Sequence, residues 1–357
     1  TFCTRYPMQR INKFFFPVLW VLLVIVLLCA IALGAVPITL QDMFLSLKHF
    51  FNGKEPASIY EGVFIQLRLP RVLLCAITGA VLAVSGVLMQ GLFRNPIVEP
   101  GLTGTSAGAA LGASVVFVLG PLFNPAIKSF TGPLLVPLAA FFGALLATYL
   151  VYVLAKSAKR VSILSLLLIG IAVNAVCLSG TGFLSYIARD PQARSITFWN
   201  LGTFSGASWQ QVLIVGSIAS IIFIVSFRYS KQLNALLLGE EEAGYLGVDA
   251  GKLKRRILLL NTAMVSVATA FAGVISFMGL IVPHLLRLLI GSDNKRLLPA
   301  AMLTGAILLV LADLFARLVL APAEVPIGII TSLVGAPVFI ILLKRFNLAQ
   351  QKGGYNA

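Results

Sequence analysis

The sequence predicts an all-α protein that spans a membrane with ten helices. Of its 357 residues, 59% are hydrophobic and 11% are charged, and its mean hydropathy is +0.98. This composition excludes an ordinary soluble domain. Most of the uncharged runs also reach the ~20 residues that a helix needs to cross a bilayer. The expected segments are 14–36, 63–92, 101–120, 133–155, 161–187, 208–227, 254–276, 280–290, 297–319 and 327–344.

The first of these segments follows a basic tail, residues 1–13. Its apolar run from Phe14 to Val36 is 23 residues long. The apolar core of a signal peptide is only ~7–15 residues long. We therefore expect a helix that is kept in the protein.

The basic residues predict the orientation of the ten segments. With the N-terminus in the cytoplasm, 18 of the 27 Lys and Arg residues lie inside, seven lie outside and two lie within segments. An excess of basic residues in cytoplasmic loops is the usual arrangement. Both termini, including the tail 347–357, are then cytoplasmic, and the net charge of +15 needs no nucleic-acid partner.

Charged residues and prolines separate the second segment from the third in "FRNPIVEPGLTGTSAGAALG", residues 93–112. Gly104, Gly108 and Gly112 then recur every four residues, a spacing that lets membrane helices approach closely. A dinucleotide-binding loop is the alternative, but no strand precedes these glycines. Close helix packing is the favoured interpretation.

The sequence contains a faint internal repeat. Ala83 to Gly86 and Ala270 to Gly273 are both AxxG motifs, and a proline follows each glycine after ten residues, at Pro96 and Pro283. The two units run in opposite directions in the predicted orientation, so we expect an inverted repeat with a helix break at each proline. The short segment 280–290 is then buried in protein or lines a cavity.

The largest polar cytoplasmic stretch is 228–256. Its leucines predict two short amphipathic helices, joined at Gly239 and ended at Gly247. The stretch is either a solvated connection or a docking site for a cytoplasmic partner, because leucines on a short exposed helix need cover.

Three arginines lie at the outer ends of the predicted helices. Arg68 and Arg71 flank a proline in "RLPR", and Arg317 follows Asp313 by four residues. Arg317 either pairs with Asp313 inside the bundle or joins the other two in a basic rim for an acidic partner.

Several functions are excluded by missing motifs. The chain has no GxxxxGK[ST] loop for ATP, no nucleophile elbow, no CxxC and only two histidines, His49 and His284. We therefore expect neither an enzyme nor a bound metal. His284 is either a packing residue or an axial ligand for an iron porphyrin.

Five ordered motifs carry a family resemblance: "RLPR", "SGVLMQGLFRNPIVEPGLTGTSAGA", "GLIVPHLLR", "ADLFAR" and "EVPIGIITSLVGAPVFIILL". With these, the chain resembles the FecCD-type permeases of type II ABC importers, which carry vitamin B12, siderophores or heme. The resemblance implies a single permease domain, 14–346, that forms a homodimer in the bacterial inner membrane. It also implies a periplasmic binding protein outside and two ABC ATPase subunits inside, which hold ATP and Mg.

The resemblance also implies roles for individual residues. Arg68, Arg71 and Arg317 correspond to the docking site for the binding protein. The segment 232–248 corresponds to the coupling helices that contact the ATPase, with contact residues Leu236, Leu237, Gly239, Glu240, Glu241, Ala243, Leu246 and Gly247.

The cytoplasmic gate corresponds to Asn95 and Ile97 after the second segment and to Ile163 and Leu164 at the start of the fifth. Members that carry B12 are polar at this second position, so the apolar pair here suits a flat, apolar cargo. Because "IVPH" occurs in members with other cargoes, the resemblance weakens His284 as an iron ligand.

Within the family the chain is most similar to the heme permeases. The resemblance therefore implies a subunit that imports heme by ATP-driven alternating access, with heme as cargo and no permanent cofactor. A ferric siderophore or B12 is the alternative cargo. A proton-coupled secondary transporter is a different class and needs a titratable relay; Asp313 is the one acidic residue clearly within a segment, and Arg317 can neutralise it. A membrane scaffold is a third class and would show no transport.

Overall fold

The structure is a computed structural model that describes residues 13–34, 39, 43, 45–46, 48–49, 58–120, 132–157, 160–161, 163–321 and 323–353. Helices make up nearly all of it, as predicted. Their bounds are α2 (Phe15–Ala32), α4 (Ile59–Gly62), η1 (Val63–Arg68), α5 (Leu69–Phe93), η2 (Pro100–Thr103), α6 (Thr105–Leu119), η4 (Gly132–Leu134), α8 (Leu135–Ala155), α9 (Ile163–Ile187), α10 (Asp190–Asn200), α11 (Trp209–Arg228), α12 (Ser230–Leu238), α13 (Glu240–Tyr245), α14 (Ala250–Ala272), α15 (Met278–Ile290), α16 (Asn294–Val319) and α17 (Ile327–Gly353). Between α8 and α9, β1 (Lys156–Ser157) and β2 (Arg160–Val161) form a short antiparallel pair.

Each of the ten predicted segments coincides with a helix. Among the described residues, six helices are long and apolar enough to span a membrane, and three shorter apolar helices accompany them. The first turns of α14 contain several charged residues. The number of crossings stays a prediction. The short helix α10 was not predicted, because its sequence is polar and its first turn contains a proline.

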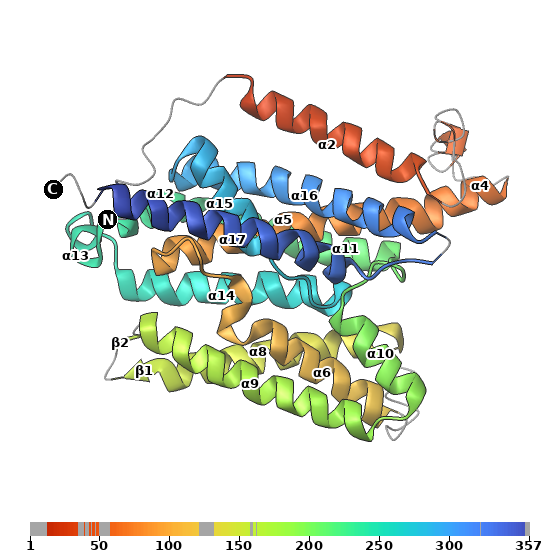
Figure 1. The fold of residues 1–357 in the computed structure, drawn as a ribbon, viewed down its shortest axis with the longest axis horizontal. Coiled ribbons are helices and arrows are strands. Elements are labelled where there is room, and N and C mark those ends of the chain that lie inside the picture. Colours follow the sequence, from red (N-terminus) through yellow and green to blue (C-terminus); the bar gives the residue numbers. More distant parts are fainter. Residues whose placement is uncertain are drawn as a thin grey trace.

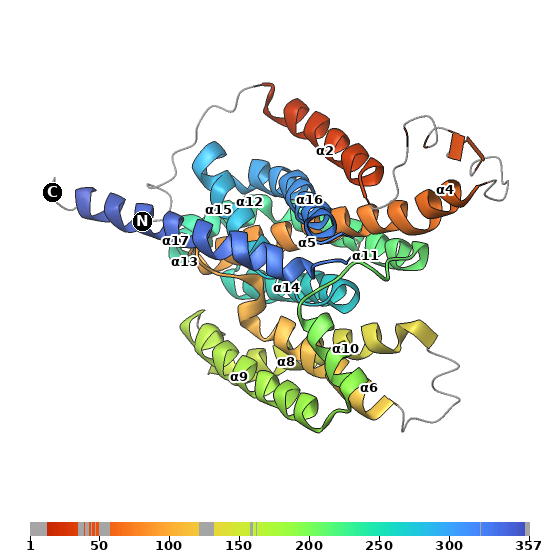
Figure 2. The same cartoon turned by 45° about the vertical axis from the view of Figure 1, so that its right-hand side comes forward.

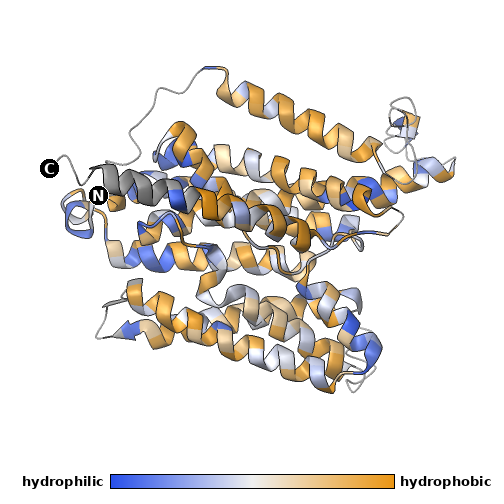
Figure 3. Cartoon of the chain, in the orientation of Figure 1, coloured by the Kyte–Doolittle hydropathy of each residue, from blue (hydrophilic) through white to orange (hydrophobic). Residues whose placement is uncertain are grey.

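The helices run along one long axis of the molecule (Figure 1). Figure 3 shows hydrophobic residues along the middle of most helices and hydrophilic ones mainly toward the two ends of the bundle, as an integral membrane protein requires. We name the end that carries α13 the inner end and the end that carries α10 the outer end, following the predicted orientation.

Helix α5 lies at the centre of the bundle, with nearly every residue from Thr78 to Phe93 buried. Its glycines allow backbone contact with two neighbours. A Cβ on Gly79 would clash with the carbonyl of Gly305 on α16, and a Cβ on Gly86 would clash with the carbonyl of Gly279 on α15. Because no side chain separates them at these positions, the backbones of α5, α15 and α16 are in direct contact.

Helices α6, α8 and α9 form a second layer beside the central helices (Figure 2). The predicted glycine spacing holds this layer together. Gly104 takes φ 86° just before α6, and Gly108 packs against Gly143 of α8. Gly112 packs against the carbonyl of Ala139, which is also on α8. The packing interpretation of these glycines is therefore confirmed.

The two predicted helix breaks differ. After α5, Arg94 takes φ 50° and Pro96 lies in the following turn, so this break is where it was expected. The expected break at Pro283 is wrong, because Pro283 lies inside α15. A proline removes only one hydrogen bond from a helix, so α15 continues through Pro283. The break lies earlier in the chain, where Gly273 (φ 73°) and Phe277 (φ 68°) have positive φ angles.

The course of the chain has the helix directions expected of the inverted repeat, which itself stays a prediction. Helices α5 and α14 pack side by side and run in opposite directions (Figure 1). Each ends in a break that leads into a further helix, η2 and α6 after α5 and α15 after α14.

Candidate functional site

The outer end contains an ion-pair cluster centred on Asp313 of α16. Arg71 Nη2 donates to Asp313 Oδ1 at 2.9 Å, and Arg71 Nε lies 3.2 Å from both carboxylate oxygens. Arg317 Nε lies 3.1 Å from Asp313 Oδ2. The predicted pair of Asp313 and Arg317 within the bundle is therefore confirmed, and Arg71 shares the same carboxylate.

Arg71 has a second acidic partner, Glu324, in the connection before α17. Its Nη1 donates to Glu324 Oε1 at 2.7 Å. The Glu324 side chain is 40% exposed and that of Arg71 is 13% exposed, whereas Asp313 is 2% exposed. Arg71 thus connects a buried carboxylate to one at the surface. No role for Glu324 was predicted from sequence, although it is the first residue of the motif "EVPIGIITSLVGAPVFIILL".

A cavity of 190 Å³ opens beside this cluster. Its lining combines the three charged side chains with aromatic, hydroxyl and apolar groups. They are Arg71, Phe198, Thr203, Phe204, Ser205, Asp313, Glu324, Val325, Pro326 and Ile327.

Arg68 and Arg317 hold the C-terminal end of α2. Arg68 Nη1 donates to the carbonyls of Ile31 at 2.7 Å and Ala32 at 2.9 Å. Arg317 Nη2 donates to the carbonyl of Ala30 at 2.9 Å. The last carbonyls of a helix lack partners within it and carry partial negative charge, so cations stabilise them. Both arginines are buried, at 7% and 8% exposure.

The docking role of the three arginines stays a prediction. In this structure Arg68, Arg71 and Arg317 all contact groups of their own chain. The contacts to α2 could not be found from sequence, because backbone carbonyls have no side-chain signature.

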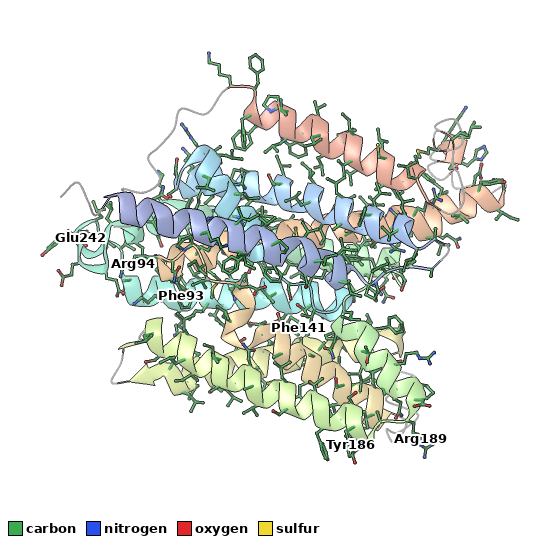
Figure 4. The ribbon with its side chains drawn as sticks, in the orientation of Figure 1. Phe93, Arg94, Phe141, Tyr186, Arg189 and Glu242 are labelled. Carbon is green, nitrogen blue, oxygen red and sulfur yellow. The ribbon has the colours of Figure 1, made fainter. Side chains whose placement is uncertain are left out.

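The first predicted gate pair lies in the turn after α5, at the inner end. Asn95 Oδ1 accepts from the N–H of Ile97 at 3.0 Å, and both residues are half-buried. Figure 4 labels the neighbouring Arg94 near the end of the molecule that carries Glu242, with Arg189 toward the opposite end.

The second gate pair lies at the start of α9. Leu164 is 65% exposed. Ile163 begins the helix, but its side chain lies outside the described residues. Helix α9 packs closely on η2, where a Cβ on Gly170 would clash with the carbonyl of Leu102. The gate function of both pairs stays a prediction.

Buried polar side chains connect the turn after α5 with α14 and α15. Ser85 Oγ donates to Asn261 Oδ1 at 2.6 Å, and Asn261 Nδ2 lies 3.4 Å from the carbonyl of Pro100. Glu99 Oε1 accepts from the N–H of Phe277 at 3.0 Å, directly before α15. Since buried polar groups must be paired, these bonds fix the position of both helix breaks.

Helix α15 carries two buried basic residues. Arg287 Nε donates to Gln90 Oε1 at 3.3 Å, and Gln90 Nε2 donates to the carbonyl of Leu280 at 3.1 Å. His284 is 6% exposed within the same helix. No group of three His, Cys, Asp or Glu side chains that could hold a metal occurs in the part of the chain that the structure describes.

The polar inner segment folds into α12 and α13, joined at Gly239 (φ 151°) and followed by Gly247 (φ 78°), as predicted. The expectation that its leucines need an external partner is wrong for Leu236 and Leu237, at 1% and 6% exposure. They are covered because α12 packs on α5 and α16. Ala243 is also fully buried.

Other residues of this segment are free for contact. Tyr245 is 90% exposed, Leu246 is 62% exposed and Leu238 is 53% exposed. Glu240, Glu241 and Gly247 are exposed as well, whereas Gly239 is buried.

Polar contacts tie the segment to the long helices. Lys254 Nζ of α14 lies 2.7 Å from Glu240 Oε1 of α13. Asn234 Oδ1 of α12 accepts from the N–H of Asn294 at 2.8 Å, at the start of α16. Asp249 caps α14 by accepting from the N–H of Lys252 at 2.9 Å, and this hydrogen bond lowers the pKa of Asp249. These contacts join α12 and α13 to the inner ends of α14 and α16.

The comparisons with known proteins agree with this arrangement. The FecCD transport family matches residues 22–345. The hemin transport system permease protein HmuU of Yersinia pestis is 40% identical over 321 residues, which cover 90% of this chain and 94% of that protein. The cobalamin import system permease protein BtuC of Halobacterium salinarum is 39% identical over 294 residues, 82% of this chain and 76% of that protein. An inward-facing structure of a metal-chelate type ABC transporter has a TM-score of 0.78 and 32% identity, with 92% of this chain and 97% of that one covered.

Proposed function

The chain belongs to the FecCD transport family, and on that premise we propose that it carries heme inward across the bacterial inner membrane by ATP-driven alternating access. It is an integral membrane protein and the permease subunit of an ABC importer. Heme, the inner membrane and cytoplasmic termini are parts of the proposal. ATP and Mg belong to the partner ATPase, and heme is cargo rather than a resident cofactor.

The cargo proposal is carried by the apolar face of α9 at the inner end. Leu164, Leu168 and Ile171 are 65%, 58% and 56% exposed, and their spacing places them on one face of the helix. The relative from Yersinia pestis is named for hemin transport. A flat porphyrin is compatible with such a surface. The relatives named for vitamin B12 or cobalamin support the second candidate cargo.

We propose a homodimer in which this α9 face borders the path on the twofold axis. Further along the same face, Leu178 is 59% exposed, and a Cβ on Gly182 would meet no atom within 4 Å. Helix α17 also exposes apolar side chains, including Leu333 at 70% and Val334 at 58%. A second copy would cover part of these surfaces.

The proposed ATPase contact is the segment 232–248. Its exposed groups, Tyr245, Leu246 and Glu241, meet the partner, while the buried Leu236 and Leu237 anchor the segment to the bundle. Transport further requires that nucleotide binds differently to the inward-open and outward-open states, because a ligand shifts only an equilibrium whose states it distinguishes.

The proposed contact with the periplasmic binding protein is the outer cluster. Arg71 is the partly exposed member, and Arg68 and Arg317 lie behind it with additional positive charge. An acidic residue of the binding protein would compete with Glu324 for Arg71. The bidentate geometry of arginine favours carboxylates in this position.

Uptake into proteoliposomes tests the proposal. The chain is assembled with its ATPase and its binding protein, and accumulation of heme, B12 and a hydroxamate siderophore is compared with and without ATP. We expect ATP-dependent accumulation of heme above that of the other two. Accumulation of a siderophore or B12 in place of heme would overturn the cargo. Uptake driven by a pH gradient without ATP would indicate a secondary transporter instead.

A further inference from the structure

A groove lies between α8 and α14 in the inner half of the bundle (Figure 1 labels both helices). Its volume of 390 Å³ falls within the ~300–1,000 Å³ typical of small-molecule sites. Tyr149 and Leu259 border it and are 63% and 60% exposed. The lining is almost entirely apolar. It consists of Thr103, Leu145, Thr148, Tyr149, Val151, Tyr152, Leu166, Arg255, Leu258, Leu259 and Thr262.

The threonine hydroxyls in this lining already have partners within the chain. Thr103 Oγ1 donates to the carbonyl of Pro100 at 3.1 Å. Thr148 Oγ1 lies 2.9 Å from Thr105 Oγ1. Thr262 Oγ1 donates to the carbonyl of Leu258 at 2.7 Å. The floor of the groove therefore favours an apolar ligand over one that needs new hydrogen bonds.

One charged side chain, Arg255, lines the inner end of the groove, and it is exposed. Two of its basic neighbours on α14 have acidic partners: Lys252 lies 3.3 Å from Asp249, and Lys254 lies 2.7 Å from Glu240. The third, Arg256, pairs with no carboxylate of the described residues, but it does not line the groove. Among the residues that the structure describes, no carboxylate pairs with Arg255. A ligand that fits the groove thus needs an apolar chain and a negative charge at its inner end.

We propose that the groove binds an anionic phospholipid of the cytoplasmic leaflet, with an acyl chain against α8 and α14 and the phosphate at Arg255. Such a lipid has the required chain and charge, and the groove opens on the surface of a membrane-spanning bundle. Basic pockets between membrane helices on the cytoplasmic side are typical sites for anionic headgroups. The inference rests on the membrane location of the chain and is independent of its cargo.

The bound lipid lies between two layers of helices and next to the segment 232–248. The acyl chain of the lipid contacts both α8 of the second layer and α14 of the central helices. Its phosphate lies at Arg255, next in sequence to Lys254, which pairs with Glu240 of α13. The lipid therefore borders the segment that we propose as the ATPase contact.

Native mass spectrometry of the delipidated full-length chain tests the site. Phosphatidylglycerol or phosphatidylcholine is titrated into wild type, Arg255→Gln and the matched control Arg256→Gln. Arg256 is the exposed neighbour on α14 that does not line the groove. We expect Arg255→Gln to weaken phosphatidylglycerol binding about five-fold, the effect of one cation near a membrane surface, and Arg256→Gln to leave it near wild type. Equal losses in both variants would mean diffuse attraction to surface charge and overturn the proposal.

The acyl chain is tested separately. Leu259→Trp places a larger side chain on the exposed border of the groove, and we expect it to weaken the binding of both phosphatidylglycerol and phosphatidylcholine. Binding that is unchanged by Leu259→Trp, or that inorganic phosphate abolishes, would reduce the site to a headgroup contact and overturn the proposal. On wild type, a photoreactive acyl chain should label Tyr149 or Leu259. Labelling confined to other helices, or cross-links from the groove to a second copy of the chain, would also contradict it.

Discussion

Arg71 and Asp313 are 242 residues apart in sequence, and their side chains form a bidentate ion pair at the outer end of the bundle. The pair joins α5 to α16, and Arg317 contacts the same carboxylate. Because Asp313 is 2% exposed, its charge is compensated by these arginines rather than by water. The outer ends of α5 and α16 are thereby held together by charge as well as by the close contact of Gly79 with Gly305.

Replacement of Asp313 with Asn should strongly destabilise the chain. The variant leaves Arg71 and Arg317 without a buried counter-charge, and breaking a buried pair costs about 3–5 kcal/mol of unfolding free energy. Glu324→Gln is the control, because loss of a more exposed pair costs roughly 1 kcal/mol or less. Thermal unfolding in detergent compares the two variants. Similar melting temperatures for both would show that Asp313 does not hold the cluster together.

Glu324→Gln should strengthen docking of the periplasmic binding protein. Removing this carboxylate frees Arg71 Nη1 for an acidic residue of the partner, and we expect about two- to five-fold tighter binding, mainly at low salt. Asp190→Asn at the start of α10 is the matched control, because it removes one exposed negative charge from the same end. Surface plasmon resonance measures both. If the two variants bind equally, the competition at Arg71 is refuted.

Gly86→Ala should destabilise the bundle by about 1–3 kcal/mol, the usual cost of overpacking. Its methyl group would meet the backbone of Gly279, which cannot move without displacing α15. In Gly182→Ala, the new methyl group meets no atom within 4 Å, so stability should stay constant or rise. Unfolding midpoints in the same detergent decide between these outcomes. Equal midpoints would contradict the close packing of α5 and α15.

Lys254→Met should uncouple ATP hydrolysis from transport. The substitution removes the contact with Glu240 between α14 and α13, and we expect two- to ten-fold less cargo moved per ATP, in line with ordinary pairwise coupling energies. Lys252→Met is the control, because the Lys252 side chain is 75% exposed and its partner Asp249 is also exposed. The charge-swapped double variant, Lys254→Glu with Glu240→Lys, should restore part of the ratio of cargo moved to ATP hydrolysed. Unchanged ratios for Lys254→Met would exclude this connection.

The cap of α14 should depend on pH. The hydrogen bond from Lys252 lowers the pKa of Asp249 in the folded chain, so its contribution is fully present above the unfolded pKa of about 3.9 and is lost as pH falls through the lower folded pKa. Protection of the first amides of α14, measured as the hydrogen-exchange rate relative to the intrinsic rate at the same pH, should therefore fall only in strong acid. Asp249→Asn keeps an acceptor oxygen and should remove this pH dependence. A loss of this protection near neutral pH in wild type would be inconsistent with the assignment.

The sequence predicted the features that depend on side-chain pattern. Apolar runs marked the long helices, and the spacing of Gly104, Gly108 and Gly112 marked the packing of α6. Gly239 and Gly247 marked the ends of α12 and α13. Each of these signals acts within one element, where local sequence determines the conformation.

Features that depend on contacts between distant segments were missed. The break before α15 was placed at Pro283, because the left-handed conformation of Phe277 is stabilised from outside by Glu99 and is invisible in local sequence. Leu236 and Leu237 were expected to be exposed, since nothing in their own helix shows that α5 and α16 cover them. The contacts of Arg68 and Arg317 with α2 involve carbonyls, which every residue has.

The backbone contact between Gly86 and Gly279 bears on how the machine moves. Side chains that interdigitate can change rotamers and slide, but two touching backbones have no such freedom. We therefore expect helices α5 and α15 to move as one rigid unit in the proposed transport cycle, with the conformational change occurring at turns outside this unit. Two such turns adjoin the unit: the left-handed turn at Arg94 after α5, and the positive-φ residues Gly273 and Phe277 before α15.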